Sequence, residues 1–355
     1  MIFKSFKLNN TKLKNRIVVS PMCQYSAKSN GCPTSWHYYH LANMVNSGAG
    51  MITIESCAVS KSGRISDKDL CLFNNNQEKH LKKLLKYLKK LKKVPIVLQI
   101  SHSGRKGSSH IPGSAKKGPL KKNEGSWQTI SASSLKKDIG WPKPKLASKK
   151  DIKKIIKQFV NTASRAKRVG FDGLEIHMAH GYLIHQFLSP ISNLRIDDYG
   201  GKFENRIKIA TEIISQIKEV WPKNKILGAR ITAIDHLKNG LSIDDSIKLC
   251  KKLDKIGFDY VCVSSGGIQR KTSRKFKKFF RSKFSKQIKY KTKLIVGITG
   301  LTSNFKKADK FIKKKFFDVV FVGRPFLKNP FFLFHDKFMK SKKFEKIPKP
   351  YQRSI

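Results

Sequence analysis

Short apolar runs that the sequence predicts to be buried β-strands are repeatedly followed by polar residues. These residues supply amides, thiols, imidazoles, phenols and cations, which are the groups that bind cofactors and move protons. In chain order they are Ser20–Tyr25, Glu55–Cys57, Gln99 with Ser101–Lys106, His177–Tyr182, Arg230, Ser264–Gly267, Gly297–Gly300 and Gly323–Arg324. Any one of these segments is compatible with a structural role. Their recurrence predicts one shared site, provided that the fold brings the strand ends together.

Two glycine-containing segments in the last quarter of the chain are typical of phosphate binding. Gly297–Gly300 and Gly323 allow backbone N–H groups to approach an anion, and Arg324 adds a forked cation. In barrels of eight parallel strands, the loops after strands seven and eight commonly hold a phosphate group. A turn with a surface arginine would explain Gly323-Arg324 alone equally well. Together, the two segments favour a phosphate site.

A cluster of titratable side chains lies between His177 and Tyr182. The spacing of His177 and His180 could serve a metal ion, but a metal site would also need a carboxylate or a third His nearby. Two imidazoles that donate hydrogen bonds to a carbonyl oxygen or an oxyanion explain the pair better. Tyr182 follows closely and can deliver a proton from its phenol. A lone His or Tyr is more often a packing residue, so it is the cluster that predicts chemistry.

The elements that must position these residues alternate along the whole chain. Eight predicted strands are apolar nearly throughout, as parallel strands buried on both faces are. They are Ile17–Ser20, Met51–Glu55, Ile96–Ile100, Gly173–His177, Ile226–Ile231, Tyr260–Ser264, Leu294–Ile298 and Val319–Val322. Helical periodicity between them predicts helices at His80–Leu91, Asp151–Val169, Asn205–Trp221, Ser242–Ile256 and Asn304–Lys314. Asp151 and Ser242 are expected as N-caps, and Gly170 and Gly257 as helix ends.

Eight strands with intervening helices fit either a doubly wound sheet or a closed (β/α)8 barrel. The barrel is favoured because functional residues follow the strands all along the chain, and a barrel brings all the carboxyl ends to one mouth. No G-x-G-x-x-G motif follows the first strand, which removes the main support for a dinucleotide-binding sheet. We therefore predict an α/β fold with a single TIM-barrel domain over residues 1–335.

Two segments lie outside the barrel pattern. The connection over about residues 101–150, after the third strand, is rich in Ser, Gly, Pro and Lys. Its length predicts an excursion over the mouth, as a small hairpin or as a lid. Residues 336–355 contain Pro348, Pro350 and a Tyr351-Gln352-Arg353 ending, and we expect this C-terminal tail to pack on another surface.

The charge of the chain is its most unusual property. Lys and Arg together number 75 against 23 Asp and Glu, which gives a formal net charge of +52. Such a balance can indicate a nucleic-acid-binding protein. Here Lys far outnumbers Arg and is spread over every helical segment. This distribution favours a solvated lysine-rich surface that binds polyanions without specificity.

The cysteines and the hydropathy predict the cellular setting. The six cysteines form no C-x-x-C pair, which argues for a reducing compartment and against zinc or iron–sulfur ligation. No run reaches the roughly 18 apolar residues that a membrane helix needs, and Met1–Thr11 lacks the apolar core of a secretory signal. We expect a cytoplasmic protein without a metal ion or membrane association.

These residues, taken in order, resemble the old yellow enzyme family of FMN-dependent ene-reductases, and most closely its thermophilic-like subclass. The most specific segments are Gly170–Gly173, Ile176–Leu183, Gln186–Pro190, Asn193–Arg195, Asp198–Gly201 and Glu204–Arg206. The resemblance extends from Ser20 to Arg353. It implies a barrel that binds FMN and oxidises NADPH or NADH, as an NADPH dehydrogenase does. It also implies reduction of the C=C bond of an α,β-unsaturated carbonyl or a related activated alkene.

At individual positions, the resemblance implies a set of flavin contacts. They are Ser20, Pro21, Met22, Cys23, Ser56, Gln99, Arg230, Gly323 and Arg324, with Ser56 standing where the family more often has Ala. His177 and His180 would hold the carbonyl oxygen of the substrate, and Tyr182 would donate the proton. Tyr25 would be a second substrate contact, and Lys106 would lie near the mouth. Arg353 would reach the site of a neighbouring subunit, which implies a homodimer or homotetramer.

Three alternative functions are weighed against this one. Larger relatives on the same barrel carry an iron–sulfur cluster and act on dienoyl thioesters or amines, but no cysteine cluster follows the eighth strand here. A lyase or isomerase barrel would need a Schiff-base lysine or a carboxylate base at a strand end, and we find neither. A basic nucleic-acid-binding protein would show less periodicity. The sequence leaves the natural substrate and the choice between NADPH and NADH open.

Overall fold

Eight parallel strands close into a barrel in the computed structural model of the chain, which describes residues 1–269, 279–300, 304–340 and 347–354. The order around the barrel is β10-β11-β12-β3-β4-β5-β8-β9. The strands are β3 (Ile17–Val19), β4 (Met51–Ala58), β5 (Ile96–Ser101), β8 (Gly173–Met178), β9 (Ile226–Thr232), β10 (Tyr260–Ser264), β11 (Ile295–Thr299) and β12 (Val319–Val322). The predicted (β/α)8 fold is confirmed.

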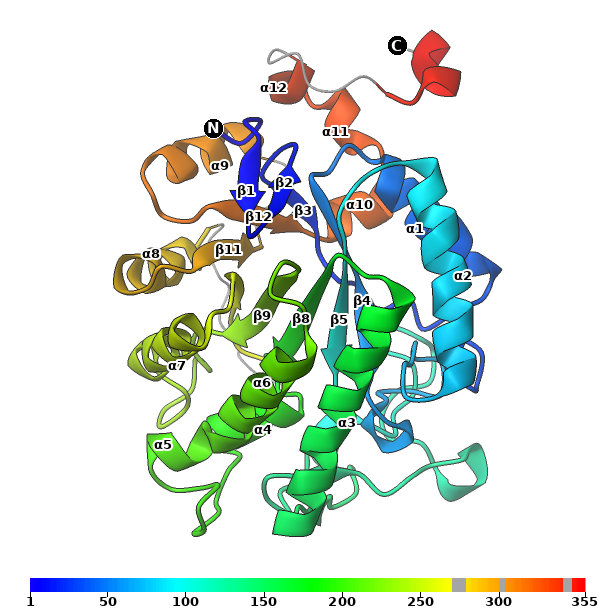
Figure 1. The fold of residues 1–355 in the computed structure, drawn as a ribbon. Helices are drawn as coiled ribbons and strands as arrows, with labels where there is room; N and C mark the ends of the chain where they lie inside the picture. Colours follow the sequence, from blue (N-terminus) through cyan, green and yellow to red (C-terminus); the bar gives the residue numbers. More distant parts are fainter. Residues whose placement is uncertain (270–278, 301–303, 341–346, 355) are drawn as a thin grey trace.

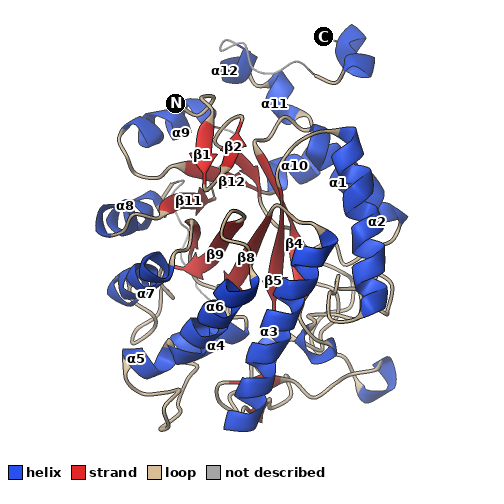
Figure 2. Ribbon diagram, in the orientation of Figure 1, coloured by secondary structure: helices blue, strands red, loops and turns tan. Residues whose placement is uncertain are grey.

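Helices connect the strands and surround the barrel (Figure 1), so that the strands lie inside a ring of helices (Figure 2). The longer helices are α1 (Ser35–Asn46), α2 (Asn75–Leu91), α3 (Lys149–Val169), α6 (Lys208–Val220), α7 (Ile243–Ile256), α8 (Ser282–Lys291) and α9 (Phe305–Lys313). The shorter ones are α4 (Leu183–Leu188), α5 (Phe203–Arg206), α10 (Arg324–Lys328), α11 (Phe332–His335) and α12 (Lys337–Lys340). The helix predicted over residues 205–221 is divided at Ile207 into α5 and α6. The sequence does not predict α1, because Trp36, Tyr38 and Tyr39 have weak helix propensity.

The interior of the barrel is a packed apolar core that is covered at one end. Ahead of the first barrel strand, β1 (Phe6–Leu8) and β2 (Thr11–Leu13) pair as an antiparallel hairpin. Leu8 and Leu13 of this hairpin are buried in one cluster with Val18 of β3 and Val97 of β5. Because the hairpin covers the amino ends of the strands, a ligand can approach from the carboxyl ends, where the polar residues lie.

Three aspartates fix the register of neighbouring strands. Each stands just before one strand and accepts a hydrogen bond from a backbone N–H near the start of the adjacent strand. The pairs are Asp172 with Ile96 at 2.9 Å, Asp259 with Leu227 at 2.7 Å, and Asp318 with Val296 at 2.9 Å. Gly170 and Gly257 end α3 and α7 in the left-handed conformation, as predicted, and turn the chain towards two of these aspartates.

The start of α3 differs from the prediction. The Oγ of Ser148 accepts the N–H of Asp151 at 3.1 Å, and the Asp151 carboxylate accepts the N–H of Ser148 at 3.0 Å. Ser148 is therefore the N-cap, and the prediction that Asp151 caps the helix is wrong. In this reciprocal capping box, the acidic residue three positions into the helix bonds back to the cap. Ser242 does cap α7, as predicted.

The long connection over residues 101–150, which we call the lid, is not a hairpin. Its two short strands, β6 (Ile130–Ser131) and β7 (Lys145–Leu146), pair in parallel. A hairpin requires antiparallel strands, so the hairpin, one of the two predicted forms, is wrong. Two parallel strands need a connection that leads the chain back to the starting end of the first strand. The residues between β6 and β7 provide this connection.

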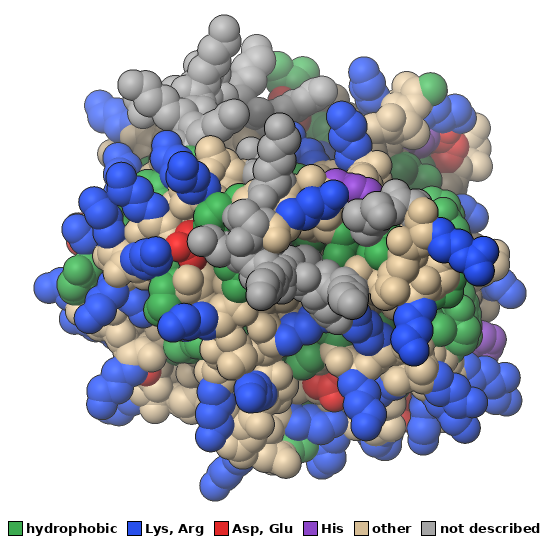
Figure 3. Space-filling view, turned by 90° about the horizontal axis from the view of Figure 1, so that it is seen from above, with side chains coloured by type: hydrophobic (Ala, Val, Ile, Leu, Met, Phe, Trp, Pro, Cys, Tyr) green, Lys and Arg blue, Asp and Glu red, His purple; other side chains and the backbone are tan. Residues whose placement is uncertain are grey.

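The surface and the C-terminal tail complete the fold. Figure 3 shows Lys and Arg side chains spread around the visible face, with few Asp or Glu between them. No concentrated basic patch stands out there, which agrees with a solvated surface. Among the described residues, no helix has the length and apolar character needed to cross a bilayer. The tail extends beyond the barrel at the top of Figure 1, where the Tyr351 ring lies 5.5 Å from that of Phe331.

Tyr260 and Gly228 form a tight contact inside the barrel. The two residues are register partners on β10 and β9, and a Cβ at Gly228 would lie 2.1 Å from the Tyr260 ring. The ring also stacks on Phe321 at a centroid distance of 5.8 Å. The ring therefore has little room to move away from position 228.

We predict that Gly228→Ala lowers the free energy of unfolding by about 1–3 kcal/mol, because the added methyl group overlaps the Tyr260 ring. Tyr260→Leu removes most of the ring, and in that background Gly228→Ala should cost less than about half as much. Urea unfolding of the single and double variants measures this coupling. Equal costs in the two backgrounds would show that Tyr260 does not determine the packing at position 228.

Candidate active site

A layer of polar side chains is buried on the barrel strands β5, β8 and β10. Gln99 on β5 and Glu175 on β8 are register partners, and Gln99 Nε2 donates to Glu175 Oε1 at 2.6 Å. The Tyr260 hydroxyl donates to Glu175 Oε2 at 2.8 Å. All three side chains are buried. Glu175 therefore fixes the orientation of the Gln99 amide, whose oxygen stays available to another donor.

Arg230 adds a cation to this layer. It stands on β9, in register with His177 of β8 and Cys262 of β10. Burial raises the pKa of the Glu175 carboxyl, and the charge of Arg230 opposes that shift. Within the described residues, the buried Arg230 Nε has no hydrogen-bond partner. Because buried N–H groups in native proteins nearly always have an acceptor, this one indicates a ligand atom.

The end of β8 and the turn after it bring together His177, His180 and Tyr182, as the sequence predicts. His180 has a left-handed backbone with φ of 58°, and its N–H donates to Thr232 Oγ1 at 3.0 Å, which holds the turn. The His177 ring centroid lies 5.1 Å from that of His180 and 4.8 Å from that of Tyr182, with both contacts edge-on. The three side chains form one group at the mouth.

Both imidazoles are neutral. Burial, and then the charge of Arg230, holds the pKa of His177 and of His180 well below the usual range. His177 Nδ1 accepts the Ala179 N–H at 3.1 Å, which places the His177 proton on Nε2, 3.3 Å from His180 Nδ1. The His180 proton is then on Nε2, facing Ser264 Oγ at 2.6 Å. The hydrogen-bond network thus assigns one N–H donor to each ring.

The loop after β3 carries Cys23 and Tyr25. The Gln24 N–H donates to Glu55 at 2.9 Å, which ties this loop to β4. Burial, together with the charge of Glu55, raises the pKa of Cys23, whose thiol is hydrogen-bonded to Tyr25. Burial also raises the pKa of Tyr25 and of Tyr182. Both phenols therefore keep their protons at neutral pH and can donate them.

Lys106 links two of the loops at the mouth. Its Nζ donates to the carbonyl oxygens of His180 at 2.6 Å and Gly267 at 2.5 Å. It also lies 5.7 Å from the centroid of the Tyr182 ring. Removal from solvent, with the like charge of Lys137 nearby, lowers the pKa of Lys106 to about 7. Lys106 thus holds the turn of the His pair against the loop after β10.

Closure of the barrel brings the first strand beside the last. β12 pairs with β3, and the Ser20 N–H donates to the Val322 carbonyl at 2.9 Å. A Cβ at Gly323 would lie 3.3 Å from Met22 Sδ. Gly300, which follows the adjacent β11, has a left-handed φ of 81°. The two glycine segments predicted to bind phosphate therefore follow adjacent strands.

The remaining predicted site residues lie either near the carboxyl ends of the barrel strands or away from the barrel. Ser56 is buried near the carboxyl end of β4, Pro21 is half-buried after β3, and Arg324 is exposed at the start of α10. Arg353 is exposed in the 3-10 helix Lys349–Ser354, which extends away from the barrel (Figure 1). The structure does not bring Arg353 to the site of its own chain. Its expected role in a neighbouring subunit stays a prediction.

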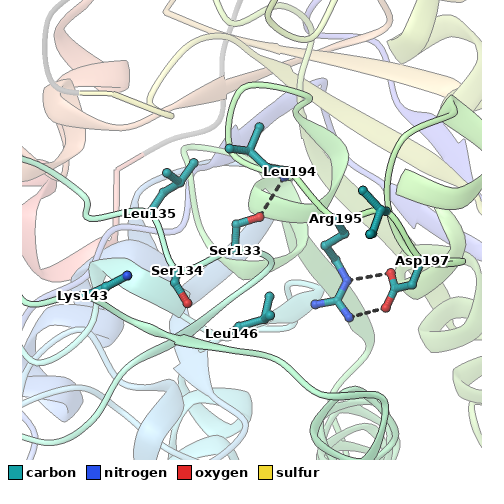
Figure 4. A pocket seen from close by; sticks show the side chains of 9 residues that line it. Ser133, Ser134, Leu135, Lys143, Leu146, Leu194, Arg195 and Asp197 are labelled. Carbon is teal, nitrogen blue, oxygen red and sulfur yellow. Dashed lines mark hydrogen bonds and ion pairs between the residues drawn. The ribbon is translucent and has the colours of Figure 1, made fainter.

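A cavity of about 510 Å³ lies beside the lid (Figure 4) and is lined by Ser133–Leu135, Lys143, Leu146 and Leu194–Asp197. Arg195 pairs with both carboxylate oxygens of Asp197. It also donates to the carbonyl oxygens of Ala132 and Ala147, on either side of the lid loop. None of the predicted site residues lines this cavity. Its residues hold the lid against the barrel.

Two anchors of the site escape the sequence analysis. Glu175 lies in a correctly predicted strand. A charged residue within an apolar run is rarely buried without a partner, and this is the signal in the sequence that could have revealed it. His185 and Asp235 are fully buried with 3.0 Å between His185 Nε2 and Asp235 Oδ1. His185 Nδ1 accepts the Gly181 N–H at 2.8 Å and so anchors the turn of His180. These partners are far apart in the chain, so no local pattern reveals them.

Metal ligation gains no support for the His pair. Across residues 1–269, 279–300, 304–340 and 347–354, no group of three or more His, Cys, Asp and Glu side chains could hold a metal ion. The six cysteines are free, and all except the half-exposed Cys23 are buried. The geometry at His177 and His180 is that of hydrogen-bond donors.

The low pKa of Lys106 predicts a specific pH dependence of stability. Because this pKa is about 7 in the fold against 10.5 ordinarily, the unfolded chain binds more protons between these values. The contribution of Lys106 to the free energy of unfolding therefore rises with pH in this window, by less than about 1.4 kcal/mol per pH unit. Urea unfolding of wild type and Lys106→Met at pH 7, 8, 9 and 10 should show the difference growing in favour of the wild type. A constant difference would show that Lys106 keeps its ordinary pKa.

Known proteins resemble this chain over nearly its whole length. Residues 1–341 match the model of the NADH:flavin oxidoreductase / NADH oxidase family. An NADPH dehydrogenase of Listeria monocytogenes is 36% identical over 332 residues, which cover 93% of this chain and 92% of that protein. An NADPH dehydrogenase of Clostridium acetobutylicum is 35% identical over 359 residues, with 100% and 99% coverage.

Solved structures share the fold at lower identity. Morphinone reductase superposes with a TM-score of 0.79 at 22% identity, covering 99% of this chain and 92% of its own. A 2-naphthoyl-CoA reductase superposes with a TM-score of 0.85 at 20% identity; 98% of this chain is covered, and it spans 53% of that longer protein. With the family model and the relatives taken together, the chain belongs to the NADH:flavin oxidoreductase / NADH oxidase family and is an FMN-dependent oxidoreductase of the old yellow enzyme type.

Proposed function

We propose that the enzyme oxidises NADPH through bound FMN and reduces the C=C bond of α,β-unsaturated carbonyl compounds or related activated alkenes. The observation that carries the proposal is the group of two neutral imidazoles and one protonated phenol, of which His177 is the register partner of Arg230. NADPH is preferred to NADH as the electron donor because the relatives at 35–36% identity are named NADPH dehydrogenases.

The residues fit FMN at both of its ends. The unpartnered Nε of Arg230 can donate to the pyrimidine edge of the flavin, where negative charge develops on reduction. Gln99, held by Glu175, can bind the polar edge, and Gly323 with Arg324 suits the phosphate. We assign the remaining flavin contacts to Ser20, Pro21, Met22, Cys23 and Ser56. When bound, FMN supplies the hydride and receives electrons from the nicotinamide.

The His pair suits a carbonyl oxygen. Each neutral ring can turn one N–H towards an oxygen that becomes more negative as the β-carbon is reduced, and preorganised donors of this kind stabilise such charge. Tyr182 is fixed edge-on against His177 and retains its proton, so we assign it as the acid that protonates the α-carbon. We assign Tyr25, whose pKa is raised by burial and by the proximity of Tyr182, as a second substrate contact.

We also propose a homodimer or homotetramer in which Arg353 reaches the site of a neighbouring subunit. The exposed Tyr351 and Arg353 stand on a segment that leaves the barrel of their own chain, which supports this role (Figure 1). The six free cysteines support a reducing compartment such as the cytoplasm.

We predict that the purified protein is yellow, or becomes yellow when FMN is added to the apoprotein. Under anaerobic conditions NADPH should bleach the bound flavin, and a small enone should restore its absorbance. Maleimides, nitroalkenes and quinones would extend the panel of oxidants. A protein that stays colourless after FMN addition would exclude the whole proposal. Flavin that NADPH reduces, but that no alkene reoxidises, would exclude alkene reduction alone.

The double variant His177→Ala/His180→Ala is expected to slow alkene-dependent reoxidation by about 10²–10³-fold, because the donors to the substrate oxygen are lost. Anaerobic stopped-flow mixing of the reduced enzyme with an enone measures the rate. His80→Asn removes an imidazole whose Nδ1 contacts the Asn76 carbonyl on the same helix, α2, and should change the rate by less than about twofold. Unchanged enone binding and unchanged reoxidation in the double variant would contradict the assignment.

A further inference from the structure

We propose that Arg281 is a second phosphate-binding cation, which holds the phosphate group of FMN together with Arg324. No motif in the sequence distinguishes Arg281 from the cations around it, and the inference rests on FMN being the flavin that binds. It extends the phosphate site of Gly323 and Arg324 to the ends of β10 and β11.

The side chain of Arg281 bridges the ends of two neighbouring barrel strands. Arg281 immediately precedes α8, and its Nε donates to the Oγ of Ser265, just after β10, at 2.9 Å. Its Nη1 lies against Gly300, just after β11, where a Cβ built on the glycine would be only 2.3 Å away. The guanidinium also lies over the Phe280 ring, 4.6 Å from the centroid. These contacts fix the cation beside the segment predicted to bind phosphate.

No carboxylate of the described residues is paired with Arg281. The sequence has no Asp or Glu between Asp259 and Asp309, so the loops on either side of Arg281 cannot supply one. Burial, and then the charges of Arg230 and Arg324, lower the pKa of Arg281 to about 10. Like charges that are partly removed from water destabilise the apoprotein, and an anion placed among them removes that penalty.

The positions of the three arginines define where the anion would bind. Arg230 is on β9, Arg281 bridges the ends of β10 and β11, and Arg324 follows β12, so the cations follow successive strands of the barrel. Gly300 has φ of 81° and no side chain, which allows the Arg281 guanidinium to lie against its backbone. A planar guanidinium presents a fork of donors that matches phosphate oxygens. A phosphate dianion suits this arrangement better than a neutral ligand.

FMN and riboflavin differ in the phosphate group alone, so the pair isolates the proposed contact. Quenching of flavin fluorescence by the apoprotein gives both Kd values. Arg281→Gln is expected to raise the Kd for FMN by about 10–100-fold and to change the Kd for riboflavin by less than about twofold. Arg281→Met, which keeps an apolar stem over Phe280, provides the same test should the Gln variant fail to fold.

Lys283→Gln is the matched control. Lys283 is exposed on the first turn of α8, two residues from Arg281, and its loss changes the net charge equally. Both Kd values should stay within about twofold of the wild type, because an exposed charge is screened by solvent. A Lys283→Gln effect on FMN as large as that of Arg281→Gln would show general charge attraction and would overturn the proposal.

A second readout separates ligand binding from a structural role. Apoprotein with Arg281→Gln should melt at or above the temperature of the wild-type apoprotein, because a repelling cation has been removed. FMN should raise the melting temperature of this variant less than it raises that of the wild type. Equal weakening of FMN and riboflavin binding, or an unchanged Kd for FMN, would overturn the proposal. Wild-type apoprotein that binds neither flavin would instead exclude the proposed function.

Discussion

The site depends on the pairing of the first barrel strand with the last. β3 and β12 are three and four residues long, and three register pairs join them. This short seam converts an open sheet into a barrel, and it places the loop that carries Met22 against Gly323. In an open sheet these two segments would stand at opposite edges. The aspartates before β8, β10 and β12 protect the arrangement, because each ties its strand to the preceding neighbour and so fixes which residues reach the mouth.

The charges at the mouth follow from this geometry. Glu175 places one buried carboxylate below Arg230, and the Gln99 amide and the Tyr260 hydroxyl satisfy its oxygens. Towards β10, β11 and β12, Arg281 and Arg324 have no such partner among the described residues. The barrel therefore carries balanced charge where a flavin ring would lie and unbalanced positive charge where a phosphate would lie. This asymmetry destabilises the apoprotein and is relieved by an anionic ligand, which is a usual compromise between stability and function.

The parts of the site that the sequence predicts are those that local pattern encodes. Strands buried on both faces give continuous apolar runs, and His177, His180 and Tyr182 lie within one turn, so both are visible in the chain. The network of Glu175 is not visible, because its hydrogen bonds join residues 76 and 85 positions apart. The two-residue strands of the lid are too short to show periodicity, which explains why the predicted hairpin is wrong. Arg281 lies in a lysine-rich stretch where nothing but the fold distinguishes one cation from another.

The neutral state of the His pair determines what the mouth can bind well. The His180 Nε2 proton already faces Ser264 Oγ at 2.6 Å, so a ligand oxygen must compete with the hydroxyl for it. A ground-state carbonyl oxygen is a modest acceptor and gains little from this exchange. In the proposed reaction, an oxygen that becomes negative during reduction of an alkene would be a much stronger acceptor, and it would win the competition as its charge grows. The hydroxyl would then compete more effectively with the substrate than with the transition state, so under the proposed function the hydrogen bond between His180 and Ser264 favours binding of the transition state.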